Sequence, residues 1–365
     1  MGNTIGSLAM NGILAIAGLG GCSDDNDADP VGRTESAARV KIGVIMPDTT
    51  SSQRWASQDT PYLKEAFAAA GVPSDIRNAE GDRAQFERIA DDMIAGGASV
   101  LIIVSQDSPT GKAVLDKAKA AGVRTIDYDR LTLNGGADYH VSFDNEAVGR
   151  LQAVGLKKCL NAKQYRNPVV ATLNGSPTDN NATLFKDGYE SILQPLYDRA
   201  EYTKGPDQWV KDWNEGEATA VFDQMLTQQP LIRGVLAAND GLADATIGVL
   251  KSQGLNGSVP VTGQDATVSG LQNILTGDQC MTVFKDIKPE AEQAAALAVA
   301  LHRGERPVVK ELLKDPESGA FVPFVKLEPT AITRANIKHV FDVGFADRAE
   351  VCSAKYVRLC RQAGI

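Results

Sequence analysis

The feature that most constrains this chain is a repeated alternation of short β-branched runs with amphipathic stretches, which begins at about residue 40. Residues 100–104 are an unbroken apolar run of strand length, as expected when both faces of a strand are buried in a parallel sheet. Ahead of that run, Phe86, Ile89, Ala90, Met93 and Ile94 recur at the spacing of one helix face. The alternation predicts an open parallel sheet with helices on both faces.

The same pattern occurs twice along the chain. The first series ends near Asp144, and a second includes expected strands at 168–173, 234–238 and 259–262. Runs at 283–285 and around 321–327, with an expected helix at 290–303 between them, are candidate further crossings between two lobes. We therefore predict an α/β protein of two doubly wound parallel-sheet lobes joined by a three-crossing hinge. The expected lobes are 40–144 plus about 286–320, and 145–285 plus about 321–350, followed by a C-terminal tail at 351–365.

Composition narrows the class of partner. A length of 365 residues suits two domains of ordinary size. The charge sum is −9, from 37 basic and 46 acidic residues, and no Lys/Arg-rich run is present. Nucleic acid is therefore not an expected partner.

Five cysteines in a chain of this length are too few for a disulfide framework, and none has the Cys-x-x-Cys spacing of a structural zinc site. No metal or other cofactor is expected. Cys352 and Cys360 could pair only if the chain breaks between them, because eight residues of continuous helix span about 12 Å. Cys159 and Cys280 are expected to be small buried hydrophobic residues.

The N-terminus has the pattern of an export signal. Residues 5–19 are apolar or small, and they lead into Leu19-Gly20-Gly21-Cys22, which resembles the bacterial lipobox. Residues 23–38 are polar, rich in Asp and without apolar periodicity. We predict a lipoprotein signal peptide at 1–22, lipidation of Cys22 and a flexible tether at 23–39. The alternative is an apolar tail with an incidental Cys, since no basic n-region precedes the apolar stretch.

Polar residues follow six expected strand ends, where open parallel sheets bind their ligands. They are Asp129-Arg130, Asp144-Asn145, Asn174 with Asp179-Asn180-Asn181, Asn239-Asp240, Gln264-Asp265 and Lys285. Such groups can pair with adjacent hydroxyls, and Trp55, Trp209 and Trp213 lie in expected loops near the same ends. The combination favours a carbohydrate site over a phosphate site.

Each signal also has a structural interpretation. An Asp or Asn after a strand is often a turn residue or helix cap. Trp209 and Trp213 could be core residues of one short helix, and Asp129-Arg130 could be a structural ion pair.

Taken together, these residues resemble type I periplasmic binding proteins of ABC sugar importers, and most closely the D-xylose-binding group. The resemblance covers about residues 40–345. Its motifs are Gln53-Arg54-Trp55, Tyr128-Asp129-Arg130, Ser142-Phe143-Asp144-Asn145-Glu146, Gly175-Ser176-Pro177-Thr178-Asp179-Asn180-Asn181, Asp207-Gln208-Trp209, Trp213, Asn239-Asp240, Gly263-Gln264-Asp265-Ala266 and Thr282-Val283-Phe284-Lys285. The Ser- and Thr-rich loop at 47–53 resembles relatives that accept several aldoses.

The resemblance implies site residues and a function. Hydrogen-bonding roles fall on Arg54, Asp129, Arg130, Asp179, Asn181, Asn239, Asp265 and Lys285, and stacking roles on Trp55 and Trp213. Asp144 and Asn145 would be structural residues at the first hinge crossing. The implied function is that of an exported, lipid-anchored receptor, periplasmic or on the outer face of the cytoplasmic membrane. It would bind a monosaccharide (xylose, or next glucose, arabinose or galactose) and deliver it to a permease coupled to a cytoplasmic ATPase.

Other functions share parts of this pattern. A sugar-sensing receptor for chemotaxis or signalling would use the same site. A sugar-responsive repressor would need a helix-turn-helix domain where an acidic tether stands. A sugar-modifying enzyme could draw a carboxylate pair from Asp129, Asp144, Asp179 and Asp265. However, the three His lack metal-ligand spacing, and neither a nucleophile elbow nor a phosphate-binding Gly loop is found, so no enzyme is expected.

Overall fold

The computed structural model describes residues 41–365. The expected signal peptide, Cys22 and the tether lie outside the described residues. Within residues 41–365, no helix combines the length and apolar character that crossing a bilayer requires.

The first lobe is built on a seven-stranded sheet in the order β10-β11-β5-β4-β3-β1-β2. All its pairs are parallel except that of β10 with β11 at one edge. Helices pack on both faces, which is why β1 and β3 are buried along their whole length. The strands are β1 (Ile42–Met46), β2 (Ser74–Asn78), β3 (Val100–Ile103), β4 (Arg124–Tyr128), β5 (Tyr139–Phe143), β10 (Leu312–Lys314) and β11 (Phe321–Leu327). The helices are η1 (Trp55–Asp59), α1 (Thr60–Ala70), α2 (Arg83–Ala95), α3 (Ser108–Ala120) and α9 (Ile287–His302).

The second lobe repeats this topology. Its central strand β6 pairs in parallel with β7 and β8, so the order β7-β6-β8 matches β2-β1-β3 of the first lobe. Parallel bridges from Val235 to Val261 and from Gln264 to Val283 extend the series toward the β9–β12 pair. The strands are β6 (Val169–Asn174), β7 (Thr203–Trp209), β8 (Ile232–Ala237), β9 (Thr282–Phe284) and β12 (Thr330–Ile332). The helices are α4 (Asn145–Ala162), α5 (Asn180–Asp198), η2 (Lys211–Trp213), α6 (Glu215–Gln228), α7 (Asp240–Ser252), α8 (Val268–Thr276), α10 (His339–Asp342), α11 (Arg348–Val351), η3 (Ala354–Tyr356) and α12 (Val357–Gln362).

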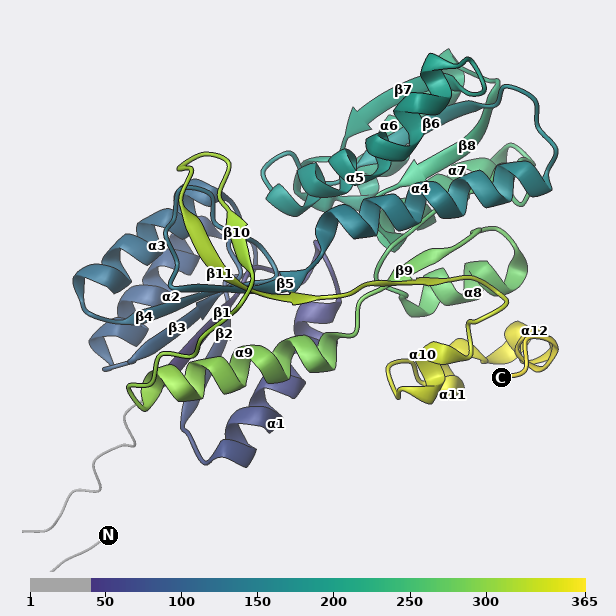
Figure 1. The fold of residues 1–365 in the computed structure, drawn as a ribbon. Coiled ribbons are helices and arrows are strands. Elements are labelled where there is room, and N and C mark those ends of the chain that lie inside the picture. Colours follow the sequence, from purple (N-terminus) through teal and green to yellow (C-terminus); the bar gives the residue numbers. More distant parts are fainter. Residues whose placement is uncertain (1–40) are drawn as a thin grey trace, which may run out of the picture. The chain divides into compact units, whose positions relative to one another are not determined.

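Three segments connect the two lobes, and Figure 1 shows them as the links from β5 to α4, from β9 to α9 and from β11 to β12. The first and third are tied together, since the backbone N–H of Asp144 donates to the carbonyl of Leu327 at 2.9 Å. The connecting segments leave the carboxyl ends of β5, β9 and β11.

Strand pairing changes the expected boundaries of the lobes. We expected the second lobe to resume at about residue 321, but β11 pairs with β5 in the first sheet, so the chain crosses only after Leu327. The expected tail at 351–365 is folded: α12 places Cys360 in a buried cluster with Leu271 and Ile274 of α8. Both differences arise because burial against a distant element, not local pattern, decides where these segments pack.

Individual strands also differ from expectation. The expected strand at 259–262 is reduced to a single bridge at Val261. Strands β2 and β7 were not predicted, because their polar residues lack the apolar run of a buried strand, and Trp209 is the last residue of β7 and not part of a loop.

Within residues 41–365, the four cysteines form two disulfides. Cys159 and Cys280 are bonded, with their Cα atoms 6.4 Å apart, whereas we expected small buried hydrophobic residues. They are 121 residues apart in sequence, so only the packing of α4 beside β9 brings them together. Cys352 and Cys360 are also bonded, and the required break is present at Ser353, whose backbone is extended (φ −73°, ψ 151°).

Candidate functional site

All ten residues selected from the sequence line one cavity between the two lobes. They are Arg54, Trp55, Asp129, Arg130, Asp179, Asn181, Trp213, Asn239, Asp265 and Lys285. The lining also contains four residues that were not selected: Ser51, Ser52, Phe185 and Gln264. Of these, Gln264 carried a signal as a polar residue after an expected strand, and Ser51 and Ser52 belong to the Ser- and Thr-rich loop at 47–53.

The strand ends explain why distant residues meet here. Asp129 follows β4 directly, and Lys285 follows β9 directly. Asp179 and Asn239 are the N-caps of α5 and α7, accepting from the backbone N–H of Asn181 at 3.0 Å and of Leu242 at 2.9 Å. These two residues therefore cap helices and also line the cavity.

The first-lobe side of the cavity is a network of buried ion pairs around Arg54, whose exposed fraction is 5%. Its Nε and Nη2 donate to the carboxylate of Asp59 at 2.9 and 2.7 Å. Nη1 donates to Asp129 at 2.8 Å, and Nη2 also donates to Glu290 at 2.5 Å. Neither Asp59 nor Glu290 was selected from the sequence, because an acidic residue inside a helical pattern carries no distinguishing signal.

Four of the five N–H groups of Arg54 donate within this network. One N–H on Nη1 remains to meet a ligand. Arg54 is therefore fixed in place by acceptors on its own lobe.

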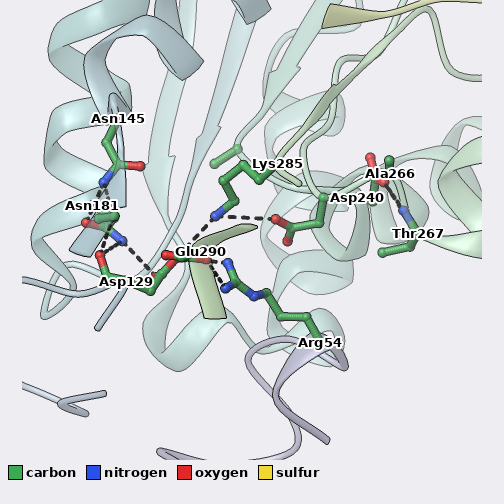
Figure 2. A network of polar contacts seen from close by, with 12 residues as sticks. Arg54, Asp129, Asn145, Asn181, Asp240, Ala266, Thr267, Lys285 and Glu290 are labelled. Atoms are coloured by element: carbon green, nitrogen blue, oxygen red, sulfur yellow. Dashed lines mark hydrogen bonds and ion pairs between the residues drawn. The ribbon is translucent and has the colours of Figure 1, made fainter. Parts of the chain in front are cut away.

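Asp129 stands at the centre of the charges. Burial by itself would raise its pKa, but Lys285, Arg54 and Arg130 lower the pKa to about 2. Figure 2 shows Lys285 and Arg54 reaching toward it from different elements, with Asn181 beside it. A carboxylate that stays ionised in this surrounding is a strong acceptor for hydroxyl groups.

Three contacts join the two sides of the cavity. Arg130 Nε lies 3.0 Å from Asp179 Oδ2, and Asn181 Nδ2 donates to Asp129 Oδ1 at 3.0 Å. Lys285 Nζ lies 3.5 Å from Asp129 and 3.6 Å from Asp265. Asn145, expected as a structural residue at the first crossing, donates to Asn181 Oδ1 at 2.8 Å and so positions its amide.

Two of the three tryptophans line the cavity. Trp55 is buried and donates from Nε1 to Ser51 Oγ at 3.2 Å, with the Arg54 guanidinium 4.6 Å from its ring centroid. Trp213 donates from Nε1 to Asp179 Oδ2 at 3.1 Å. Trp209 does not line this cavity, and its ring instead lies 5.8 Å from Lys186 Nζ.

The Asp265 loop is held from behind by Asp240, which is fully buried. Asp240 accepts from the backbone N–H of Thr267 at 2.8 Å, from Gln279 at 2.7 Å and from Thr282 at 2.9 Å. Asp265 itself has a left-handed backbone (φ 94°), an unfavourable conformation for a non-glycine residue. Figure 2 shows Asp240, Ala266 and Thr267 grouped together at this end of the network.

Two acceptors in the cavity lack hydrogen-bond partners among the described residues. They are Oδ1 of Asp265 and Oε1 of Gln264. Buried polar atoms normally have a partner, so these atoms offer acceptor positions for the hydroxyls of a ligand. Within residues 41–365, no cluster of three or more His, Cys, Asp and Glu residues is arranged to hold a metal ion.

Comparison with known proteins identifies the family. Residues 42–306 match the periplasmic binding protein domain. The chain belongs to this family. It is 33% identical to the D-xylose-binding periplasmic protein of Escherichia coli, over 86% of this chain and 93% of that protein. It is also 32% identical to the multiple sugar-binding periplasmic receptor ChvE of Rhizobium radiobacter, over 85% of this chain and 91% of that protein.

Solved structures of the family have the same fold. A carbohydrate transporter solute-binding protein of Chloroflexus aurantiacus, in complex with D-glucose, superposes with a TM-score of 0.78 at 27% identity, covering 85% of this chain and 98% of that one. The two-lobed α/β architecture predicted from the sequence is that of type I periplasmic sugar-binding proteins.

Proposed function

We propose that the protein binds a neutral monosaccharide in the cavity between its lobes, with D-xylose the first candidate and D-glucose, arabinose and galactose next. The observation that carries this proposal is the cavity lining, which combines paired charges, free acceptors and two tryptophans. The hydroxyls of a sugar form hydrogen bonds with polar groups, and its C–H faces pack on aromatic rings. A monosaccharide could therefore contact both the polar and the aromatic residues of the lining.

The charges favour a neutral ligand over an ionic one. Arg130 is paired with Asp179, while Arg54 and Lys285 are surrounded by carboxylates. A phosphate would have to displace these carboxylates from their cations. A hydroxyl can use the remaining donors and acceptors without breaking the pairs.

The ten lining residues selected from the sequence are proposed to contact the sugar, with Trp55 and Trp213 stacking on its ring. The relatives include both xylose-binding and multiple sugar-binding proteins, which supports an aldose without fixing one. The loop at 47–53 supplies only small hydroxyl side chains, Ser51 and Ser52, to the cavity lining, so we expect it to tolerate more than one aldose.

We further propose that the protein is the receptor of an ABC importer, exported and anchored by a lipid at Cys22, which delivers the sugar to a permease. Membership of the periplasmic binding protein family supports export and a binding role rather than an enzymatic one. A chemotaxis or signalling receptor would use the same site and is the second candidate.

Calorimetric titration of the protein with D-xylose, D-glucose, L-arabinose and D-galactose tests the ligand. We expect saturable heat and a raised melting temperature with at least one of them. The absence of both effects with all four sugars would contradict the proposal. A modification assay on the bound sugar should return it unchanged, and a chemically altered product would instead indicate an enzyme.

Binding is also expected to close the lobes, because the proposed contacts come from both. Arg54 and Asp129 belong to the first lobe, whereas Asp179, Trp213 and Asp265 belong to the second. A ligand that touches both sides stabilises the closed form. Solution scattering should show a smaller radius of gyration with saturating sugar, and Trp213 fluorescence should change with the same affinity. Superimposable scattering curves would contradict the hinge, even if the sugar binds.

A further inference from the structure

One buried carboxylate behind the cavity has too few partners for its charge. Glu290 lies on α9, shortly after the crossing that carries Lys285, and its side chain is fully buried. Only its Oε2 takes part in a hydrogen bond, from Arg54 Nη2, and Oε1 has no partner among the described residues. An ionised carboxylate in that position would be poorly compensated.

Its neighbours are better satisfied. Asp59 accepts two hydrogen bonds from Arg54 and one from the hydroxyl of Tyr128 at 2.6 Å. Asp129 accepts from Arg54 and from Asn181, and it also faces Lys285. Among the buried carboxylates around Arg54, Glu290 is therefore the one with the weakest support for a negative charge.

The number of charged groups in the cavity also favours a protonated carboxylate. Three cations, Arg54, Arg130 and Lys285, face five carboxylates, which are those of Asp59, Asp129, Asp179, Asp265 and Glu290. None of these eight side chains is more than 11% exposed. A proton on one carboxylate reduces the excess of negative charge at the smallest cost.

We propose that Glu290 is a positioning residue that holds Arg54 toward the ligand and takes up a proton when sugar binds. This inference rests on the proposed sugar-binding function. A protonated Glu290 keeps Oε2 as an acceptor for Arg54 without adding charge beside Asp129. Sugar displaces water from the cavity and lowers the local dielectric, which disfavours the ionised form further.

The titration of Glu290 falls in a measurable range. Burial raises the pKa of Glu290; Arg54 and Lys285 oppose this rise, Asp129 and Asp59 add to it, and the pKa lies at about 8. The groups facing it are Arg54 just before η1 and Asp59 at its end, Tyr128 at the end of β4 and Asp129 just after it, and Lys285 from the crossing before α9. If the sugar complex has the higher pKa, the affinity is full below pH 7 and falls as the pH rises through 8.

Calorimetry of D-xylose and D-glucose binding in buffers of different ionisation enthalpy tests the proposal. We expect an uptake of about 0.3–0.5 proton per sugar at pH 8 and none at pH 6, with a dissociation constant that rises above pH 8. Glu290→Gln should bind as well as the wild type at pH 6, within about threefold, and should show neither the uptake nor the pH dependence. Glu290→Ala, which removes the acceptor, should bind more weakly at every pH.

Glu292→Gln is the matched control, since Glu292 lies on the same helix and is 54% exposed. It should behave as the wild type. Sugar binding by the wild type without proton uptake would overturn this inference alone, as would an uptake that persists in Glu290→Gln. Absence of any sugar binding by the wild type would instead overturn the proposed function. The wild-type measurement needs no variant, so it decides the question even if a substitution impairs folding.

Discussion

The two sides of the cavity are built by different physical means. On the first lobe, Arg54 is held by the buried side chains of Asp59 and Glu290, and Asp129 is held by Arg54 and Lys285. On the second lobe, Asp179 and Asn239 are positioned as the N-caps of helices. The side chain of Asp265 is positioned by the left-handed backbone conformation of that residue. The second lobe also has a disulfide between Cys159 on α4 and Cys280, which lies two residues before β9.

This difference predicts how a substitution on each lobe affects the rest of the site. A charge network depends on its ionised members, because removing one leaves its partners buried and unpaired. A capped helix terminus depends mainly on local geometry, so each second-lobe residue should be separable from its neighbours.

Asp129→Asn should weaken sugar binding most, by about 100-fold or more. It removes the acceptor charge shared by Arg54 and Lys285, and charge-assisted hydrogen bonds contribute about 1.5–3 kcal/mol each. The melting temperature should fall as well, because two cations lose a buried partner. Calorimetry and thermal unfolding measure both effects. Asp138→Asn, at a first-lobe ion pair that is 30% exposed on the Asp side, is the control. If both substitutions changed the affinity and the melting temperature equally, the charge network around Arg54 would have no special role in sugar binding.

Asp265→Ala should weaken binding by about tenfold or more and leave the melting temperature nearly unchanged. The carboxylate of Asp265 has one long ion pair, with Lys285 at 3.6 Å, so the fold depends on it little, whereas a sugar hydroxyl would depend on it directly. Asp223→Ala, on the exposed side of α6, should change neither quantity. An unaltered affinity in Asp265→Ala would remove this residue from the proposed site.

Gly175→Ala tests the second lobe without touching a polar group. A Cβ at Gly175 would overlap the ring of Trp213, so the ring must move and its stacking on the sugar should weaken. We expect a loss of about three- to tenfold in affinity, with a shifted Trp213 emission. Gly248→Ala, on α7 with open space around its Cβ position, is the matched control. Retention of full affinity in Gly175→Ala would indicate that Trp213 does not stack on the ligand.

Removal of the Cys159–Cys280 disulfide, by replacing both residues with Ser, should leave the affinity unchanged. It should lower the free energy of unfolding by about 3–5 kcal/mol, since the bond closes a loop of 121 residues. The Cys352–Cys360 bond closes a loop of only 8 residues, and its removal should cost about 2.5 kcal/mol. Urea unfolding compares the two. A large loss of affinity in the first variant would mean that this disulfide also sets the geometry of the second-lobe side.

Much of the fold could be predicted from the sequence, because the decisive signal is local. The periodicity of residues 86–94 and the apolar run at 100–104 correspond to α2 and β3. Where the signal was weak, the prediction failed: β2 and β7 are polar strands, recognisable only from their pairing with β1 and β6.

The sequence by itself determined which polar residues follow the strands. A parallel sheet places the carboxyl ends of its strands along one edge, so these residues were expected to lie together. This is why Asp129, Asp179 and Lys285, which are far apart in the chain, could be grouped in advance. Only the tertiary structure decided what stands behind them. Glu290 and Asp59 contact Arg54 because α9 packs beside η1, and Cys159 meets Cys280 because α4 packs beside β9. Contacts between elements distant in sequence depend on how their surfaces fit, and no local pattern records that fit.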